Sequence, residues 1–115
     1  MSAYVVGLGV RLFSPEGEKC FGPGIAELLE RILREGSLRK AAGEMGMAYS
    51  RAWHVVNECE RVLGFEIIAR SVGGRAGGGS RLTEKGAALL RDYRRLEADV
   101  KDHAQKAAEA LFQDR

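Results

Sequence analysis

Three predicted helices, each followed by a glycine, constrain the fold of this 115-residue chain more than any other feature. Between residues 23 and 63, apolar side chains recur every three or four positions, the spacing of one face of a helix. Gly36, Gly46 and Gly64 follow the three segments, where a glycine can adopt the left-handed conformation that ends a helix. Only three residues join the second of these helices, about 38–45, to the third, about 49–63. So short a turn is typical of a helix-turn-helix.

Short strands are predicted on both sides of the helices. Residues 4–13 are rich in β-branched and aromatic side chains, and they predict a strand that returns as a hairpin near residue 19. A second hairpin is predicted after the third helix, with strands at about 65–71 and 81–82 around a glycine-rich loop. The loop, residues 72–80, lacks the Gly-Lys-Ser/Thr of a nucleotide-binding loop. We interpret it as the tip of a wing.

The last predicted helix begins at its N-cap Thr83 and continues for about 27 residues. Its apolar positions alternate in spacings of four and three, a heptad seam that a long helix normally buries against a partner helix. The residues expected to make dimer contacts are Leu89, Tyr93, Leu96, Val100 and His103. The predicted fold is therefore mainly α with small β, a winged helix-turn-helix domain at 1–82 followed by a C-terminal dimerisation helix at 83–115.

Composition and charge narrow the possible functions. The net charge is only +2, but residues 37–82 hold seven basic and four acidic side chains, so the positive charge lies in the middle of the chain. No apolar run is long enough for a transmembrane helix and the first residues do not resemble a signal peptide, so we expect a cytoplasmic protein without membrane association. Cys20 and Cys59 form neither a disulfide framework nor a CxxC metal pair. No arrangement typical of catalysis stands out, and we expect no enzyme activity, cofactor or metal.

The third predicted helix has a polar face suited to DNA. Ser50, Arg51 and His54 lie opposite its apolar side and Tyr49 lies at its start, within the turns that a recognition helix uses to read bases. Arg51 can donate two hydrogen bonds to O6 and N7 of guanine. Ser50 can contact a phosphate or a base, and Tyr49 can reach a phosphate through its hydroxyl. In the wing, glycines let backbone N–H groups approach phosphates, and Arg75 at the tip can enter a minor groove.

Several motifs match known families. The segments SLRKAA at 37–42 and LTEKG at 82–86 resemble the LysR-like winged helix-turn-helix. The segments GMAYSRAW at 46–53 and RSVGGRAGGGSRLT at 70–83 are similar to the N-terminal domain of ModE-type molybdate-responsive regulators. This similarity covers about residues 8–100, and the combination of the helix motif with the glycine-rich wing makes it specific.

The resemblance implies a homodimer that binds a palindromic site in double-stranded DNA and regulates transcription. The third helix would lie in the major groove, the wing at 72–81 on the backbone or in the minor groove, and the last helix at the dimer contact. The residues it assigns to DNA are Tyr49, Ser50, Arg51 and His54 in the helix and Arg75 and Arg81 in the wing. Family members that sense molybdate carry C-terminal oxyanion-binding domains without a counterpart in these residues, so molybdate is not expected to bind this chain alone.

Two alternatives remain open. One is a winged helix that serves as a protein-interaction or assembly module without specific DNA binding, which the small net charge and the long last helix both permit. Another is a truncated sensor that receives its effector through another chain. Salt dependence separates DNA binding from the interaction module, because contacts to several phosphates lose orders of magnitude in affinity as salt rises.

Overall fold

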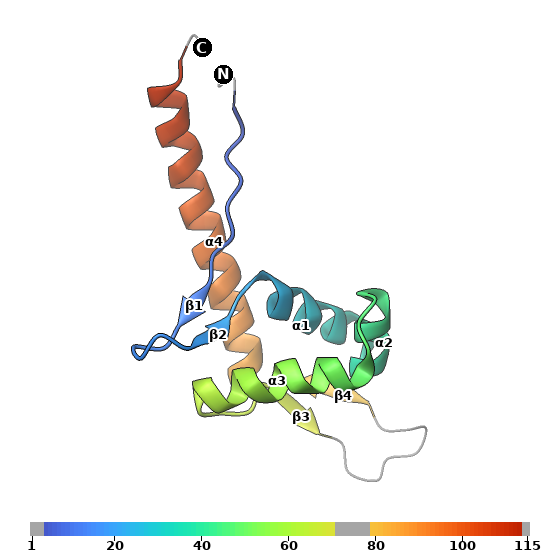
Figure 1. Ribbon diagram of the computed structural model, residues 1–115. Helices are drawn as coiled ribbons and strands as arrows, with labels where there is room; N and C mark the ends of the chain where they lie inside the picture. The colour runs from blue at the N-terminus through green and yellow to red at the C-terminus, as the bar shows by residue number, and fades with distance from the viewer. Residues whose placement is uncertain (1–3, 71–78, 114–115) are drawn as a thin grey trace.

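Four helices and two small antiparallel sheets make up the part of the chain that the computed structural model describes, residues 4–70 and 79–113 (Figure 1). The elements in chain order are β1 (Leu12–Phe13), β2 (Lys19–Phe21), α1 (Pro23–Glu35), α2 (Leu38–Glu44), α3 (Tyr49–Leu63), β3 (Ile68–Arg70), β4 (Ser80–Leu82) and α4 (Glu84–Leu111). Strand β1 pairs with β2, and β3 pairs with β4. The winged helix-turn-helix predicted from the sequence is confirmed.

The helix ends lie where local side-chain and backbone chemistry predicts them. Gly36 and Gly64 close α1 and α3 with φ of 68° and 84°, a backbone conformation that is strained for other residues. Ser37 and Thr83 cap α2 and α4, because each hydroxyl oxygen accepts a hydrogen bond from the backbone N–H three residues later, at 3.1 and 2.9 Å. Local chemistry therefore determines most of the element boundaries.

The turn between α2 and α3 is tight and closely packed. Gly46 takes φ of 66°, and the Met47 N–H donates to the Ala42 carbonyl at 2.8 Å, which folds the chain back at once. Ala41, Ala42 and Ala52 are fully buried on the facing sides of the two helices. Such small side chains let α2 and α3 approach closely, so the opposite face of α3 points outward.

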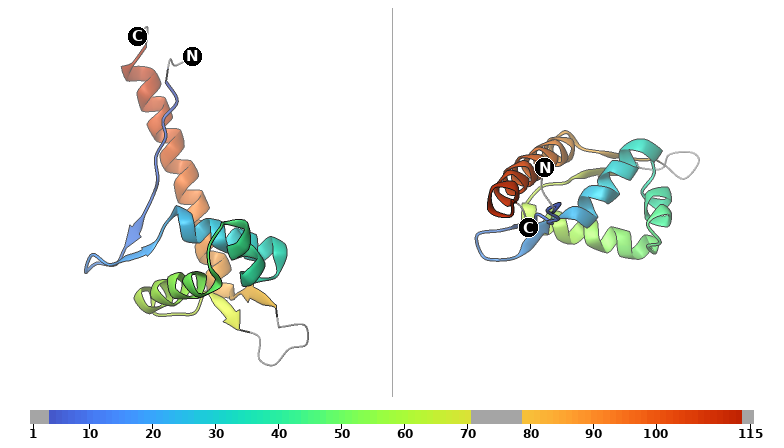
Figure 2. Two further views of the ribbon diagram at one scale, coloured as in Figure 1. Left: turned by 45° about the vertical axis from the view of Figure 1, so that its right-hand side comes forward. Right: turned by 90° about the horizontal axis from the view of Figure 1, so that it is seen from above.

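A single core joins the helix-turn-helix to the start of α4. Seen from above, α1 lies between α3 on one side and α4 on the other (Figure 2). The largest side chains that are fully buried come from every part of the fold: Phe21, Leu28, Leu29, Ile32, Leu38, Val56, Ile67, Ile68 and Tyr93. The first turns of α4 therefore belong to the same packed unit as the helix-turn-helix.

The predicted strand at residues 4–13 is wrong for most of its length. Only Leu12–Phe13 pairs as β1, while the preceding residues run beside α4 without a strand partner (Figure 1). Side chains of α4 bind this segment instead. Gln105 accepts the Val6 N–H at 2.8 Å and donates to the Tyr4 carbonyl at 2.9 Å, and the Tyr93 hydroxyl donates to the Val10 carbonyl at 2.7 Å. Hydrogen bonds to a helix therefore replace the strand pairing that the β-rich composition predicts for this segment.

The heptad seam of α4 divides into an inner part, which packs in the protomer's own core, and an outer part from Leu96 onward. Tyr93, predicted as a dimer contact, is 1% exposed and packs edge to face on Phe21, so this prediction is corrected. Leu89 is also partly buried against the protomer's own core. Beyond them Leu96, Val100 and His103 lie on the projecting part of a helix about 42 Å long (Figure 1). Despite that length, no helix in the described ranges is apolar enough to cross a membrane.

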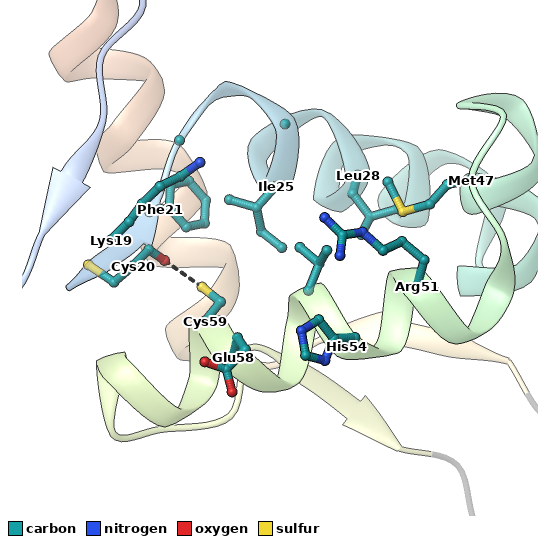
Figure 3. Close-up of a pocket in the computed structure, with 13 residues that line it drawn as sticks. Lys19, Cys20, Phe21, Ile25, Leu28, Met47, Arg51, His54, Glu58 and Cys59 are labelled. Carbon is teal, nitrogen blue, oxygen red and sulfur yellow. Dashed lines mark hydrogen bonds between the residues drawn. The ribbon is translucent and has the colours of Figure 1, made fainter.

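A cysteine side chain of α3 binds the backbone of β2 without a disulfide. The Cys59 thiol, 6% exposed, donates to the Cys20 carbonyl at 2.7 Å (Figure 3). Burial, with a smaller effect of Cys20, raises the pKa of the Cys59 thiol to about 12. Its reactive thiolate is therefore scarce near neutral pH.

Replacing Gly86 by alanine should destabilise the fold. An added Cβ would lie 2.3 Å from the Ile67 carbonyl oxygen, a backbone atom that cannot move aside cheaply. We expect Gly86→Ala to lower the free energy of unfolding by about 2 kcal/mol or more, measured by urea denaturation. Gly43→Ala is the matched control in α2, where nothing lies within 4 Å and alanine should stabilise by up to about 1 kcal/mol. Equal effects of the two substitutions would refute the close approach.

The two cysteines should differ in alkylation rate. In the native protein at pH 8, we expect iodoacetamide to modify half-buried Cys20 at least about tenfold faster than Cys59, as measured by peptide mass spectrometry. In urea the two rates should become similar, because unfolding removes the burial that suppresses the Cys59 thiolate. Equal rates in the native state would contradict the described burial of Cys59.

Candidate nucleic-acid interface

The first turns of α3 expose four of the residues predicted to contact DNA. Tyr49 is 37% exposed at the first position of the helix, and Ser50, Arg51 and His54 are exposed on the next turns. Ala52 and Val56 on the opposite side are fully buried, so the core fixes the rotation of the helix about its axis. The polar side chains are thus presented together on a rigid element.

An arginine that sequence reasoning missed contacts this face. The Arg39 guanidinium of α2 lies over the Tyr49 ring, 4.0 Å from its centroid, and Tyr49 meets Trp53 edge to face at 6.4 Å. Such cation–aromatic contacts stabilise by about 0.5–1 kcal/mol at exposed sites. Arg39 is therefore positioned to orient Tyr49. The helical periodicity of the sequence does not predict the contact between Arg39 and Tyr49, because the two residues lie on different helices.

The first turn of α3 offers backbone donors to an anion. Its N-cap, Ala48, has no side chain able to accept a hydrogen bond, unlike Ser37 and Thr83 at the starts of α2 and α4. The N–H groups of the first turn consequently lack a side-chain acceptor, and the helix dipole places partial positive charge there. Helix ends of this kind are suited to an anion such as a phosphate group.

Ion pairs leave an excess of cations on this side of the molecule. Glu44 binds Arg31 at 2.9 Å and Glu58 binds Arg61 at 3.1 Å, and in each case the arginine holds the pKa of the carboxyl below its usual range. In contrast, the exposed cations Arg39, Lys40, Arg51 and Arg81 have no ion-pair partner among the described residues. Local positive potential therefore exceeds what the net charge of +2 suggests.

The wing starts beside the helix-turn-helix. Ile68 pairs with Leu82 and Ala69 with Arg81, and the Ser80 N–H donates to the carbonyl of Gly36 at 2.9 Å. This last bond anchors β4 at the junction of α1 and α2. Arg81 is exposed on β4, whereas the predicted tip residue Arg75 lies outside the described residues. The structure thus describes the base of the wing and the position of Arg81, whose contact with DNA stays a prediction.

Side chains that could ligate a metal ion do not cluster in the described ranges. No group of three or more His, Cys, Asp or Glu side chains there is arranged to hold a metal ion. His54 is exposed on α3 and His103 is exposed on α4, with no shared site. What the described surface offers is hydrogen-bond donors and cations on one helix face and one hairpin, an arrangement suited to a polyanion.

Comparison with known proteins agrees with this geometry. Residues 26–87, which span α1 to the start of α4, match the family described as bacterial regulatory helix-turn-helix protein, lysR family. The chain is 34% identical over 84 residues to the molybdenum transport protein ModE of Azotobacter vinelandii, covering 73% of this chain and 31% of that protein. It is 40% identical over 73 residues to the molybdenum-pterin-binding protein MopB of Rhodobacter capsulatus, covering 64% and 27%.

A third relative matches a longer part of the chain. The chain is 34% identical over 92 residues to the DNA-binding transcriptional dual regulator ModE of Escherichia coli K12, covering 80% of this chain and 34% of that protein. The chain thus spans about a third of the length of these relatives. The resemblance to ModE-type regulators seen in the sequence is confirmed. Because the matched family covers more than half of the chain, this protein belongs to the lysR family of bacterial regulatory helix-turn-helix proteins.

Proposed function

We propose that this chain is a transcriptional regulator that binds double-stranded DNA sequence-specifically as a homodimer. In this proposal α3 lies in the major groove, and the wing at residues 72–81 lies on the backbone or in the minor groove. The observation that carries it is the exposed Arg51, unpaired among the described residues, on the first turns of the outward helix of a helix-turn-helix. A relative named as a DNA-binding transcriptional regulator supports the same function.

We assign the recognition of DNA sequence to the first two turns of α3. Arg51 has the planar fork that pairs with O6 and N7 of guanine, a contact that contributes about 1–3 kcal/mol of discrimination. Ser50 and His54 flank it on the exposed face and can contact bases or phosphates. Arg39 would act indirectly, because its contact with the Tyr49 ring fixes where the phenol hydroxyl points. The reading of bases and the orientation of the Tyr49 hydroxyl are therefore assigned to different residues.

Affinity is assigned mainly to phosphate contacts. The open first turn of α3, the Tyr49 hydroxyl, Lys40 and Arg81 are all exposed donors or cations. Arg75 would add another contact from the tip of the wing. Each neutralised phosphate releases condensed counterions, so affinity should fall steeply as salt rises.

A second copy of the chain is proposed to cover the outer part of α4. Leu96 is 38% exposed there, and other large apolar side chains are exposed near the two chain ends, namely Tyr4 at 51%, Val5 at 92%, Leu111 at 67% and Phe112 at 40%. Isolated exposed apolar residues are common, but a group of this kind on a projecting helix and the chain segments beside it is typical of an interface. Pairing through α4 would place two α3 helices on one DNA molecule.

Molybdate binding is not included in this proposal. The relatives whose names mention molybdenum match this chain over only 31% and 27% of their own lengths. Their similarity to it overlaps the helix-turn-helix, which the resemblance assigns to DNA rather than to molybdate. We propose that DNA binding by this chain requires no cofactor.

The salt dependence of binding to duplex DNA tests the proposal against an interaction module. Fluorescence anisotropy with a labelled duplex should show affinity falling by roughly 10³-fold or more between 50 and 200 mM salt, as expected for a dimer that neutralises six or more phosphates. Absence of salt-dependent binding would reject the DNA-binding proposal. It would then favour a winged helix used for protein assembly.

Arg51→Ala and Arg81→Ala should have different effects on DNA binding. Arg51→Ala is expected to reduce the preference for a selected duplex over a scrambled one by about 5- to 150-fold. Arg81→Ala should weaken binding to both duplexes and lower the salt slope by about one phosphate contact per protomer. Arg95→Ala on α4 removes an exposed arginine far from α3 and serves as the control. Unchanged preference in the Arg51 variant would refute its reading role.

Leu96→Glu should weaken the proposed dimer. A carboxylate at this position would have to be desolvated in an apolar interface, so we expect the dimer dissociation constant to rise at least about tenfold in sedimentation experiments. Leu33→Glu is the matched control, because Leu33 is 59% exposed on α1, away from the projecting part of α4. If both variants dimerise like the unmodified protein, α4 does not form the interface.

A further inference from the structure

A cleft of about 390 Å³ lies between α3 and the segment formed by β2 and the start of α1 (Figure 3). Its α3 side includes Arg51, Val55 and Cys59, which are one and two turns apart on a single face of the helix. Eight residues separate the first from the last, so the cleft extends about 12 Å along α3. Its size falls within the range of small-molecule sites in proteins.

The cleft has an apolar floor. Ile25 and Leu28 approach from α1, Val55 from α3 and Met47 from the turn before α3 (Figure 3). Val55 and Met47 are only partly buried, so the walls are accessible to a ligand. A molecule with an apolar body would bury this surface on binding, at roughly 25 cal/mol per Å² removed from water.

The charges at the rim are positive on balance. Arg51 extends from α3 toward α1, while Lys19 lies at the other end beside Phe21 (Figure 3). Neither cation has an ion-pair partner among the described residues. The one carboxylate of the lining, Glu58, is neutralised by Arg61, which donates to it at 3.1 Å. The cleft therefore favours an anion.

We propose that this cleft binds a small monocarboxylate with an elongated apolar body. Its carboxylate would pair with the Arg51 guanidinium, which can donate two parallel hydrogen bonds to a carboxylate. Its apolar body would lie along Val55 and Ile25 toward Cys59, with Lys19 adding attraction from the far end. Small polar anions would gain little, because most of the contact surface is apolar.

Such a ligand would compete with DNA for Arg51. The ligand site stands on the cleft alone, whereas this consequence rests on the proposed DNA-binding function. A guanidinium held by a carboxylate in the cleft is not free to pair with guanine. Occupation of the cleft should therefore lower affinity for the preferred duplex and reduce sequence preference.

Titration of the full ¹⁵N-labelled chain with octanoate, without DNA, tests the ligand site. Amide chemical shifts in two-dimensional NMR spectra should change in a saturable way at Lys19, Ile25, Val55 and Cys59, and remain constant along the outer part of α4. The neutral analogue 1-octanol should bind at least about tenfold more weakly, because it cannot pair with Arg51. Inorganic phosphate should produce no saturable shifts in the cleft. Equal binding of octanol, or octanoate shifts outside the cleft, would overturn the proposal.

Two variants test octanoate binding in the cleft, one by filling its volume and one by reversing a charge at its rim. Val55→Phe should fill the cleft and weaken octanoate binding at least about tenfold, and Lys19→Glu should weaken it about threefold or more by reversing a rim charge. Lys101→Glu on α4 is the matched charge control and should bind octanoate like the unmodified chain. Retained affinity in both cleft variants would overturn the proposal. A separate titration of the DNA complex with octanoate tests the competition, and its failure alone would leave the NMR result standing and reject only the coupling to DNA.

Discussion

The backbone of Ile67 is the point on which the relative placement of α3, the wing and α4 depends. Its N–H donates to the Glu60 carboxylate of α3 at 2.8 Å, and its carbonyl accepts the Thr83 N–H at 3.0 Å. Gly86 of α4 packs against the same carbonyl so closely that no Cβ fits. Because Ile67 is fully buried, these bonds are protected from water and fix three elements at one residue. The exposed face of α3 and the base of the wing therefore form one rigid surface.

Much of the fold could be predicted because it is encoded locally. Gly36, Ser37, Gly64 and Thr83 each act on the residues next to them, so their capping roles were read from the sequence alone. Residues 4–11 show the limit of this reasoning. Their composition indicates extended chain, but whether a strand or a helix side chain such as Gln105 satisfies the backbone depends on residues about a hundred positions away.

The difference between features encoded locally and features that depend on distant residues also applies to the candidate sites. Helical periodicity places Ser50, Arg51 and His54 opposite the apolar side of α3 and Tyr49 at its start, because that inference needs only the rotation of a helix. It does not reveal the Arg39 contact or the cleft, which require the packing of α2, α1 and β2 against α3. Likewise, the heptad pattern of α4 does not indicate that Tyr93 is buried in its own protomer. Tertiary contacts decide what a periodic apolar position faces.

Selection of duplexes from a random-sequence pool by the full chain tests the central claim most directly. A dimer that reads DNA with α3 should enrich an inverted repeat, with half-sites separated by about one helical turn or a multiple of it. This result would connect the exposed face of α3, its partner in the second protomer and the sequence they read. Failure to enrich any sequence at low salt would contradict the account and move the function of this fold to protein assembly.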